Sequence, residues 1–537
     1  MRKILVFFLL FLIANGFSQE DAWVYFTNKP NASYFLANPL EMLSQKALNR
    51  RTAQAIPLDI VDVPIHQPYI LQVAGNSGIT VLAKSKWLNA VHVRGTQANI
   101  EALDTISFVS HIHFANSSLN GSTSGRMSQI YAEAKNLDTQ VVFQYGNSAN
   151  QVNMMNGHLL HQNNYTGTDK IIAVMDNGFV GVNSTVPFQR LFTNNLILGG
   201  YNFVTQSDAI YTGGSHGTMV LSTMGGYVEN ELIGSAPDAK YYLFVTESNT
   251  YENPLEESLW VEAAEMADSL GVDVINTSLG YAAFDNPAYN YTYAAMNGTT
   301  TFIAKGAAIA FSRGMICVTS AGNSGTTTWQ YITTPGDALN TLTVGAVNAS
   351  GVYASFSSIG PSADNRIKPD VVAQGVGATV ATASGSIGVA NGTSFSSPIT
   401  AGLVACLWQS LPNLTNAEIL QLVKQSASIY ATPTAQLGYG IPNFYAAFQA
   451  GQLLSNDEVT TKSFSVYPNP FDEQLIIQWS EMNSIGELQL YNATGQLILQ
   501  SKINSNQTLS VAHLKPGMYF YLLQSDGLMK SGKIIKK

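Results

Sequence analysis

Near-continuous apolar runs recur through the middle of the chain and are separated by longer mixed segments. The runs are IIAVM (171–175), YYLFV (241–245), VDVIN (272–276), MICVTSA (315–321) and TLTVGAV (341–347). Strands that are buried on both faces show this pattern, as in a parallel sheet covered by helices. Segments of helical pattern at 254–271 and 300–314 lie between the runs and end at glycine. The alternation predicts an α/β domain over about residues 140–450, with a parallel sheet sandwiched by helices.

The chain before this domain has a different pattern, and we expect residues 19–139 to form a small α+β domain and a connector. Residues 68–73 and 79–95 look rich in strands, residues 96–103 are predicted to be helical, and residues 108–114 alternate like a strand. The polar segment ANSSLNGSTSGR, which follows directly, has the composition of a flexible connector.

The C-terminal part of the chain changes pattern again after a polar linker at residues 451–462. Residues 463–537 contain short segments in which apolar and polar side chains alternate, separated by turn signals such as NATG (492–495). We predict a small all-β domain there, built as a β-sandwich.

The first residues have the features of a secretory signal. Arg2 and Lys3 precede an apolar run at residues 4–13, and small residues then allow cleavage after Ser18, so residues 1–18 are predicted to be a signal peptide. The run is too short to span a bilayer, and no later stretch of about 18 apolar residues occurs. We therefore expect an exported protein without a transmembrane segment.

Composition and cysteine content exclude several kinds of partner. Charged residues make up 11% of the chain, below the roughly 25% of typical soluble domains. A net charge of −9 without a basic tract argues against nucleic acid. Cys317 and Cys406 lie in apolar runs and are expected to be inert, although a disulfide between them stays open at this point. The absence of CxxC and of clustered histidine indicates neither zinc nor redox chemistry.

Two candidate catalytic residues lie at the C-terminal end of a predicted strand or at the N-terminus of a predicted helix, where functional groups gather in parallel sheets. Asp176 ends the first run and precedes Asn177 and Gly178, although an ordinary turn aspartate would look the same. His216 lies in a glycine-rich turn before an apolar helix. The helix dipole disfavours a cation there, so we expect a neutral imidazole suited to a general base, or else a partly buried structural histidine.

Ser394 lies in NGTSFSSP (391–398), directly before an apolar segment that is predicted to be a buried helix. Hydroxyl residues at this place commonly cap helices. The same place leaves a backbone N–H unpaired and favours negative charge, which suits a nucleophile whose attack creates an oxyanion. Asn323, in TSAGNSG (319–325), offers an amide that could face the same oxyanion.

The order Asp, His, Ser is the one found in subtilisin, and seven blocks of sequence resemble the subtilisin-like serine peptidases, the subtilase family. The blocks are VMDNGF, SHGTMV, VINTSLG, SAGNSG, ASFSSIGP, RIKPDVVAQG and NGTSFSSP, in the family's order over about three hundred residues. The resemblance implies the subtilisin-like fold. It implies that Ser394 is the nucleophile, His216 its general base and Asp176 the residue that orients the imidazole. Asn323 and the Ser394 backbone N–H then become the oxyanion donors.

The resemblance also implies a substrate site. Ser278, Leu279 and Gly280 match the edge segment that pairs with an extended substrate in this family. Ala321 and Gly322 are expected to wall the pocket for the residue before the scissile bond.

The chain departs from the family pattern at positions beside the catalytic residues. Asn177 stands where Thr or Ser is usual, Met219 where many members have a second His, and Gln374 where Pro is usual. Phe395 and Ser396 replace a common Met and Ala. None of these positions is catalytic, so we expect them to affect specificity rather than activity.

The flanking domains resemble processed parts of secreted precursors. The N-terminal domain is similar to the propeptides of this family, and its alternative is a separate binding domain. The C-terminal domain, with VYPNPF (466–471) and LKPGMYFY (514–521), resembles the C-terminal sorting domains of the type IX secretion system. A plain β-sandwich that binds carbohydrate is the alternative there.

Together these features predict a secreted serine endopeptidase made as a precursor and exported through the periplasm to the medium or the cell surface. Its expected partners are protein or peptide substrates and the type IX secretion machinery. We expect no cofactor in the chemistry. Family members often bind structural calcium, but no loop is specific enough to assign a metal ligand. A catalytically silent adhesin or binding protein, and a ligase or cyclase that keeps the triad, are the alternative functions.

Overall fold

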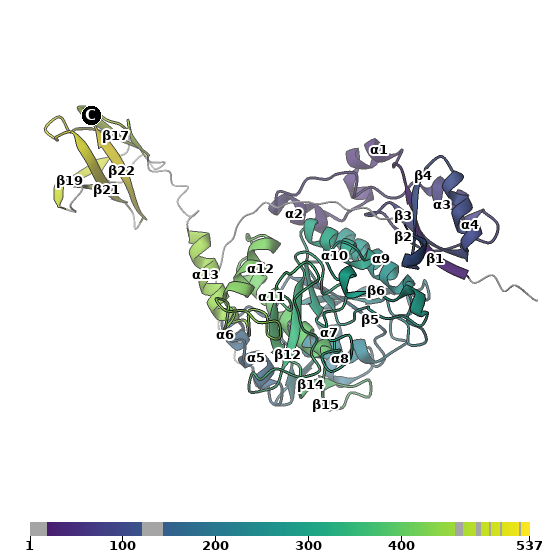
Figure 1. Cartoon of the computed structure of the whole chain (residues 1–537). Coiled ribbons are helices and arrows are strands. Elements are labelled where there is room, and N and C mark those ends of the chain that lie inside the picture. The colour runs from purple at the N-terminus through teal and green to yellow at the C-terminus, as the bar shows by residue number, and fades with distance from the viewer. Residues whose placement is uncertain are drawn as a thin grey trace, which may run out of the picture. The chain divides into compact units, whose positions relative to one another are not determined.

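The computed structural model describes residues 19–120, 143–456, 465–478, 485–492, 496–504, 507–525 and 528–537. The predicted signal peptide, most of the connector and much of the linker lie outside these ranges. The chain divides into two compact units after Gly451 (Figure 1). The first unit holds the N-terminal domain and the α/β domain, and the second is the C-terminal domain.

The centre of the first unit is a seven-stranded sheet whose neighbouring strands are parallel, as predicted. In spatial order its strands are β13 (Val371–Gln374), β12 (Leu342–Val347), β11 (Ile316–Ser320), β10 (Val274–Thr277), β5 (Ile171–Asp176), β9 (Lys240–Val245) and β6 (Ile197–Asn202). The five apolar runs became β5, β9, β10, β11 and β12. The sequence pattern missed β6 and β13, the two edge strands, because β6 is partly exposed with two glycines and β13 is only four residues long.

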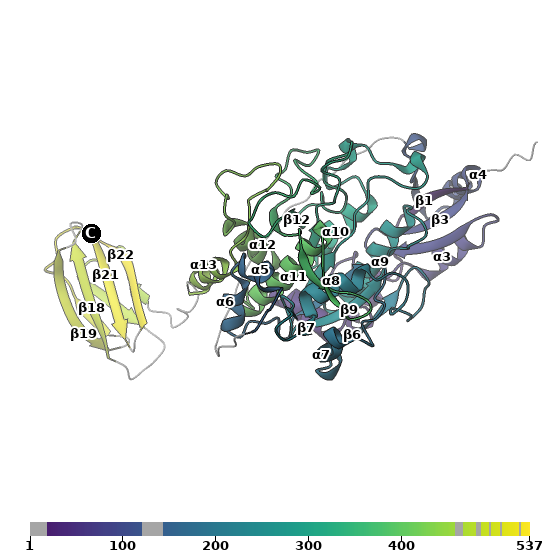
Figure 2. The same ribbon diagram turned by 90° about the horizontal axis from the view of Figure 1, so that it is seen from below.

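Helices cover both faces of this sheet (Figure 2). They are α8 (His216–Gly225) and α11 (Thr393–Ser410) on one face, and α9 (Leu255–Leu270) and α10 (Phe302–Ser312) on the other. Alternate residues of β5 show the division, because Ile172 and Val174 pack in the core with α11 whereas Ala173 and Met175 pack with α9 and α10. Almost every residue of α11 is buried. The sheet and α11 therefore form the rigid centre of the domain.

Shorter elements complete the α/β domain. They are α5 (Ala149–Asn153), α6 (Gly157–Gln162), α7 (Gln189–Thr193), α12 (Asn416–Gln425), α13 (Phe444–Asn456), the strand pair β7 (Tyr227–Val228) and β8 (Leu232–Ile233), and the strand pair β14 (Ala378–Ala381) and β15 (Ile387–Ala390). Helix α13 extends into the first residues of the predicted linker. Cys317 and Cys406 are buried and free, so the disulfide left open by the sequence is not formed.

The N-terminal domain is a four-stranded antiparallel sheet with helices on one face. Its elements are β1 (Gln19–Phe26), α1 (Ala32–Ala37), α2 (Gln45–Ala53), α3 (Gln67–Ala74), β2 (Thr80–Ser85), β3 (Ala90–Thr96), α4 (Gln97–Glu101) and β4 (Val109–Phe114), with sheet order β2-β3-β1-β4. The expected strand at residues 68–73 was wrong, since this segment forms α3. Pro68 occupies its first turn, and Tyr69, Ile70 and Val73 pack together against the sheet with helical spacing.

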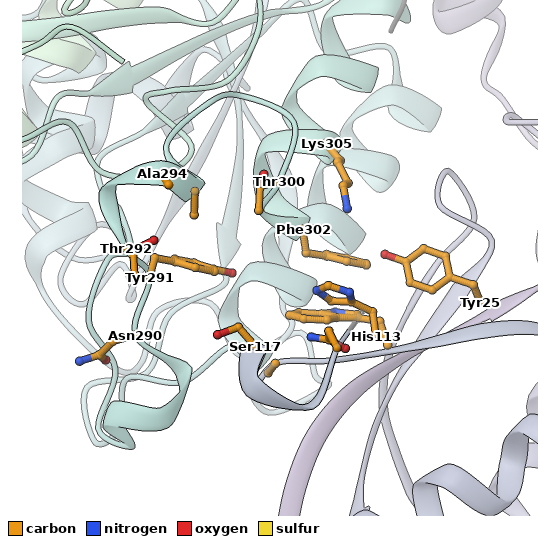
Figure 3. Close-up of a pocket in the computed structure, with 14 residues that line it drawn as sticks. Tyr25, His113, Ser117, Asn290, Tyr291, Thr292, Ala294, Thr300, Phe302 and Lys305 are labelled. Carbon is orange, nitrogen blue, oxygen red and sulfur yellow. The ribbon is translucent and has the colours of Figure 1, made fainter. Parts of the chain in front are cut away.

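The other face of this sheet packs on α9 and α10. The Trp23 ring stacks on Phe302 with 4.9 Å between ring centroids, and its indole N–H donates to Ser258 Oγ at 2.7 Å. Between the two domains remains a pocket of about 360 Å³. In Figure 3 the side chains of Tyr25 and His113 from the N-terminal sheet face Phe302 and Lys305 of α10 across this pocket.

A second contact, remote from this sheet, is made of buried charges. Arg51 of α2 reaches Asp268 of α9 at 2.7 Å and Asp62 at 2.8 Å, and Arg50 also pairs with Asp268. Arg313, just after α10, reaches Asp62 at 3.3 Å. Both aspartates are fully buried. The chain between β1 and α3 therefore anchors the N-terminal domain at the far ends of α9 and α10.

The C-terminal unit is all-β, as predicted. Its strands are β16 (Ser465–Tyr467), β17 (Gln474–Gln478), β18 (Ile485–Asn492), β19 (Leu497–Asn504), β20 (Gln507–Ser510), β21 (Gly517–Ser525) and β22 (Leu528–Lys536). They form a three-stranded sheet, β16-β17-β20, and a four-stranded sheet, β19-β18-β21-β22. Leu475 of the first sheet and Leu488 and Leu523 of the second share one core. None of the helices within the described ranges is long and apolar enough to cross a membrane.

The charged anchor generates a stability prediction. Arg51→Ala leaves the buried carboxylates of Asp62 and Asp268 short of a partner, and we expect it to lower the free energy of unfolding by about 3–5 kcal/mol. Lys84→Ala is the matched control, because Lys84 is exposed and its pair with Glu262 should contribute less than about 1 kcal/mol. Both variants are made in the chain from Gln19 that also carries Ser394→Ala, so that the N-terminal domain stays attached, and denaturant unfolding followed by tryptophan fluorescence measures both. Equal midpoints for the two variants would contradict the anchor.

Candidate active site

The predicted acid–base pair lies at the C-terminal edge of the parallel sheet. Asp176 is the last residue of β5 and is buried, and His216 is the first residue of α8. The His216 Nδ1 lies 2.8 Å from Asp176 Oδ1, which also accepts the backbone N–H of Asn177 at 2.8 Å. The structure therefore brings together two residues that are forty positions apart in the chain.

Asn177, one of the departures from the family pattern, directly follows this aspartate. The Asn177 side-chain amide donates to Asn249 Oδ1 at 3.0 Å. Asp176 Oδ2 is buried and has no hydrogen-bond partner within the described part of the chain. Asp176 Oδ1 therefore accepts two hydrogen bonds, whereas the buried Oδ2 accepts none from the described residues.

The charge state of His216 differs from the sequence expectation. The nearby Asp176 carboxylate raises the pKa of His216 to about 9 against the opposing effect of burial, and Glu247 adds to the rise. The helix dipole alone favours a neutral ring. A hydrogen-bonded carboxylate at 2.8 Å is a closer and larger charge than a helix terminus, so the expectation of a neutral resting imidazole was wrong.

Ser394 is the second residue of α11 and is buried beside the end of β10. Its hydroxyl donates to the Ser278 carbonyl at 3.2 Å, and its own carbonyl accepts from Ser278 Oγ at 2.9 Å. That carbonyl lacks a helical partner because Pro398, four residues on, has no N–H. No hydrogen bond joins the Ser394 and His216 side chains, both of which are described. The His216 ring does contact Phe395, with 5.9 Å between centroids, so the base borders the first turn of α11.

Asn323 and the Ser394 backbone N–H border one open space. Thr393 donates to Asn323 Oδ1 from its backbone N–H at 2.9 Å and from its hydroxyl at 3.0 Å, which orients the Asn323 amide. A Cβ atom placed on Gly392 would lie 3.6 Å from Asn323 Nδ2 and 3.7 Å from Ser394 N. Gly392 has φ +151°, which disfavours side chains. This glycine therefore keeps open the place where two donors could meet an oxyanion.

The predicted substrate-binding residues lie in the segments that follow β10 and β11. Leu279 and Gly280 follow β10, and their backbone groups make no hydrogen bond to any residue that the structure describes. Gly322 donates its N–H to Thr393 Oγ1 at 3.2 Å, and Ala321 is buried against β12. The pair Leu279–Gly280 thus offers free donors and acceptors to an extended chain.

Some residues that shape this site were missed as individual residues in the sequence. Thr393 orients Asn323, and Gly392 keeps the space open; both lie inside the NGTSFSSP block and were not singled out. Glu247, between β9 and α9, acts on His216 from a distant position in the chain, and no short motif could have shown this. Among the described residues, no three His, Cys, Asp or Glu side chains are arranged to hold a metal ion.

Comparison with known families agrees with this architecture. The subtilase family profile matches residues 167–441, the Bacteroidota peptidase S8 propeptide domain matches residues 21–132, and the secretion system C-terminal sorting domain matches residues 465–537. The sorting domain indicates that the protein is exported to the medium or the cell surface.

Individual relatives are bacterial peptidases. Subtilisin NAT of Bacillus subtilis subsp. natto is 32% identical over 300 residues, covering 54% of this chain and 68% of the relative. Subtilisin of Bacillus pumilus is 31% identical over 300 residues, covering 54% of this chain and 94% of the relative.

Two solved structures that resemble part of this chain are PagA and MycP1. The prenylagaramide maturation protease PagA has a TM-score of 0.43 and 20% identity, over 55% of this chain and 98% of that one. MycP1 with its N-terminal propeptide removed has a TM-score of 0.44 and 21% identity, over 56% and 96%. The profile match spans most of the parallel-sheet domain and includes every residue of the candidate site. The chain belongs to the subtilase family and is a serine endopeptidase with a propeptide domain and a C-terminal sorting domain.

Proposed function

We propose that this chain hydrolyses peptide bonds through a triad of Ser394, His216 and Asp176 and through an acyl-enzyme. The observation that carries the proposal is the 2.8 Å contact between His216 and the buried Asp176, beside the first turn of the helix that holds Ser394. A nucleophile at a helix N-terminus, a base beside it and a carboxylate that orients the base are the parts that acyl transfer requires.

In the proposed mechanism Ser394 Oγ leaves the Ser278 carbonyl, turns to His216 Nε2 and attacks the peptide carbonyl while the imidazole takes its proton. Asp176 keeps the remaining proton on Nδ1 and stabilises the imidazolium. The Asn323 amide and the Ser394 backbone N–H donate to the oxyanion. His216 then protonates the leaving amine, and a water molecule releases the acyl group by the same steps in reverse. The proposed chemistry uses only the chain's own groups and water.

The substrate is proposed to bind as an added strand. Its backbone pairs with the free groups of Leu279 and Gly280, and the side chain before the scissile bond lies against Ala321 and Gly322. Ser278 stays bonded to Ser394 and so aligns this edge with the nucleophile.

The flanking domains are proposed to act during export and maturation. The chain passes through the periplasm, and the type IX secretion machinery recognises its C-terminal domain. The N-terminal domain stays bound to the α/β domain until the active site of the same chain cuts the connector. Structural calcium remains a proposal without assigned ligands.

A catalytically silent binding protein would also keep Ser394 bonded to Ser278, so the resting hydrogen bond does not separate the two functions. A serine-directed fluorophosphonate separates them, because it labels only an activated nucleophile. Added amine nucleophiles separate hydrolysis from the ligase or cyclase alternative by the products that form.

We predict that the wild-type chain from Gln19 loses its N-terminal domain on incubation, whereas Ser394→Ala stays whole and loses peptidase activity almost completely. The missing hydroxyl removes the nucleophile, so neither maturation nor turnover can begin. Intact mass and hydrolysis of a quenched peptide measure both effects. Ser394→Ala activity equal to that of wild type would defeat the assignment.

Asn323→Ala is expected to keep a measurable fraction of activity. Removing one side-chain donor to the oxyanion should lower kcat by about 10²–10³-fold, which corresponds to about 3–4 kcal/mol, with little change in KM. Asn413→Ala is the control, because Asn413 is exposed and lies beyond the opposite end of α11. A change confined to KM would show that Asn323 binds substrate rather than the oxyanion.

The raised pKa of His216 predicts the pH profile. Because only the neutral imidazole accepts the proton, kcat/KM should rise with pH as His216 deprotonates, with a limb near pH 9. The Glu247 carboxylate favours the imidazolium, so Glu247→Gln lowers the pKa of His216 and moves the limb to lower pH. The profile is measured with an uncharged peptide, with Glu229→Gln, at an exposed position, as control. An unmoved limb in Glu247→Gln would contradict this coupling.

A further inference from the structure

The pocket between the N-terminal domain and the α/β domain is not used by the proposed chemistry. It has a volume of about 360 Å³, and the residues that line it include Trp23 and Tyr25 of β1, His113 of β4, and Phe302 and Lys305 of α10 (Figure 3). Pockets that bind small molecules have volumes of about 300–1,000 Å³ and combine apolar walls with a few polar groups. This pocket is therefore large enough for a small organic molecule.

Aromatic side chains form much of the wall of this pocket. The Trp23 ring, which is stacked on Phe302 at 4.9 Å, also contacts the His113 ring with 5.9 Å between centroids. Tyr25 and Tyr291 add two further rings to the lining. Flat apolar groups pack favourably against such rings. The walls therefore favour a ligand with an aromatic body.

Three polar groups at this pocket have no partner among the residues that the structure describes. The Lys305 ammonium, the Tyr25 hydroxyl and the His113 ring nitrogens make no hydrogen bond or ion pair there. All three side chains are half-buried. In Figure 3 the three side chains converge beside the Phe302 ring. Because buried polar groups in native proteins normally have hydrogen-bond partners, this convergence indicates a place for a polar group of a ligand.

The charges at the pocket favour an anion. Burial lowers the pKa of Lys305, although the Glu257 carboxylate acts in the opposite direction. Both oxygens of that carboxylate are already engaged, by the Tyr291 hydroxyl at 2.6 Å and by the Ile303 N–H at 3.0 Å. Burial and the nearby Lys305 charge lower the pKa of His113 to about 4, so its ring is uncharged at neutral pH and has one N–H to donate. A negative group beside Lys305 would offset the cost of burying its ammonium without a counter-ion.

The polar groups of the pocket suit a carboxylate and do not suit a metal ion. Within the described ranges, no three His, Cys, Asp or Glu side chains are arranged to hold a metal. The Lys305 ammonium would also repel a cation. A carboxylate has two oxygens that accept several hydrogen bonds, so it can take an ammonium, a phenol and an imidazole N–H at once.

We propose that this pocket binds a small aromatic carboxylate. The carboxylate accepts hydrogen bonds from Lys305, Tyr25 and His113, and the aromatic ring lies against Trp23 and Phe302. Because these contacts come from both domains, the ligand binds while the N-terminal domain is docked and stabilises that docked state. The site acts on the precursor and does not depend on the catalytic chemistry.

The chain from Gln19 that carries Ser394→Ala tests the proposal, because its N-terminal domain stays attached. The probes are naphthoate and naphthamide, which share one ring system and differ in charge. Ligand-observed NMR titrations at neutral pH should give a Kd of about 1 mM or tighter for naphthoate, and binding roughly tenfold or more weaker for naphthamide. Naphthoate should also raise the midpoint of thermal unfolding.

A variant at Lys305 locates the binding. Lys305→Gln, added to the same chain, removes the charge, so the Kd of naphthoate should rise roughly tenfold or more while that of naphthamide stays unchanged. Lys305 has no described partner, so this variant should unfold at the same midpoint as its parent when no ligand is present. Lys84→Gln is the matched control, because Lys84 is an exposed lysine of β2, and it should keep the parent's Kd.

The outcomes that contradict the site are distinct from failure of the peptidase. Equal affinity for naphthoate and naphthamide, naphthoate binding that survives Lys305→Gln, or no binding at millimolar naphthoate would each overturn the site. Inorganic phosphate that binds as tightly as naphthoate would overturn the assignment of an aromatic ligand. Each of these results leaves the peptidase function standing, because fluorophosphonate labelling of the wild-type chain tests that function separately.

Discussion

The arrangement of the site depends on one constraint, the burial of α11 on all sides against the parallel sheet. A helix that has no exposed face cannot shift without opening the core, so its first turn is held at a defined place beside the end of β10. Pro398 frees the Ser394 carbonyl, and Ser278 occupies it. Ser394, the proposed nucleophile, is thereby held beside the end of β10.

The electrostatics of the site illustrate how a short-range charge overrides a helix terminus. The N-terminus of α8 disfavours a cation at His216, yet the hydrogen bond to Asp176 raises the pKa of the imidazole to about 9. In the proposed mechanism the same helix-terminus effect stabilises the negative charge that attack by Ser394 creates. In the proposed mechanism a stabilised imidazolium suits the tetrahedral intermediate, in which the ring carries the transferred proton, while a neutral ring is required to begin attack.

Sequence patterns predicted those features that rest on local chemistry or on buried periodicity. The five central strands were visible because doubly buried strands are apolar throughout, and the candidate catalytic residues stood out because their sequence blocks are continuous. Sequence patterns did not reveal the edge strand β6, the helix at residues 68–73 or the position of Glu247. Strand β6 is partly exposed, and the helix is too short for a clear period. Glu247 acquires its meaning only when folding places it beside His216.

The two contacts between the N-terminal domain and the α/β domain differ in the free energy that is needed to break them when the domains separate. At the sheet, Trp23 leaves an apolar neighbour, Phe302, and the lost burial is not recovered in water. At the charged anchor, Arg51 and Asp268 separate from each other and water solvates both ions. Dissociation of the domains therefore costs much less free energy there than deleting one of the two side chains in the assembled molecule. The aromatic contact should therefore contribute most to the affinity of the separated domain, whereas the charged anchor fixes where that domain docks. Because the charge pairs are directional, they select one docking arrangement among the many that an apolar face would tolerate.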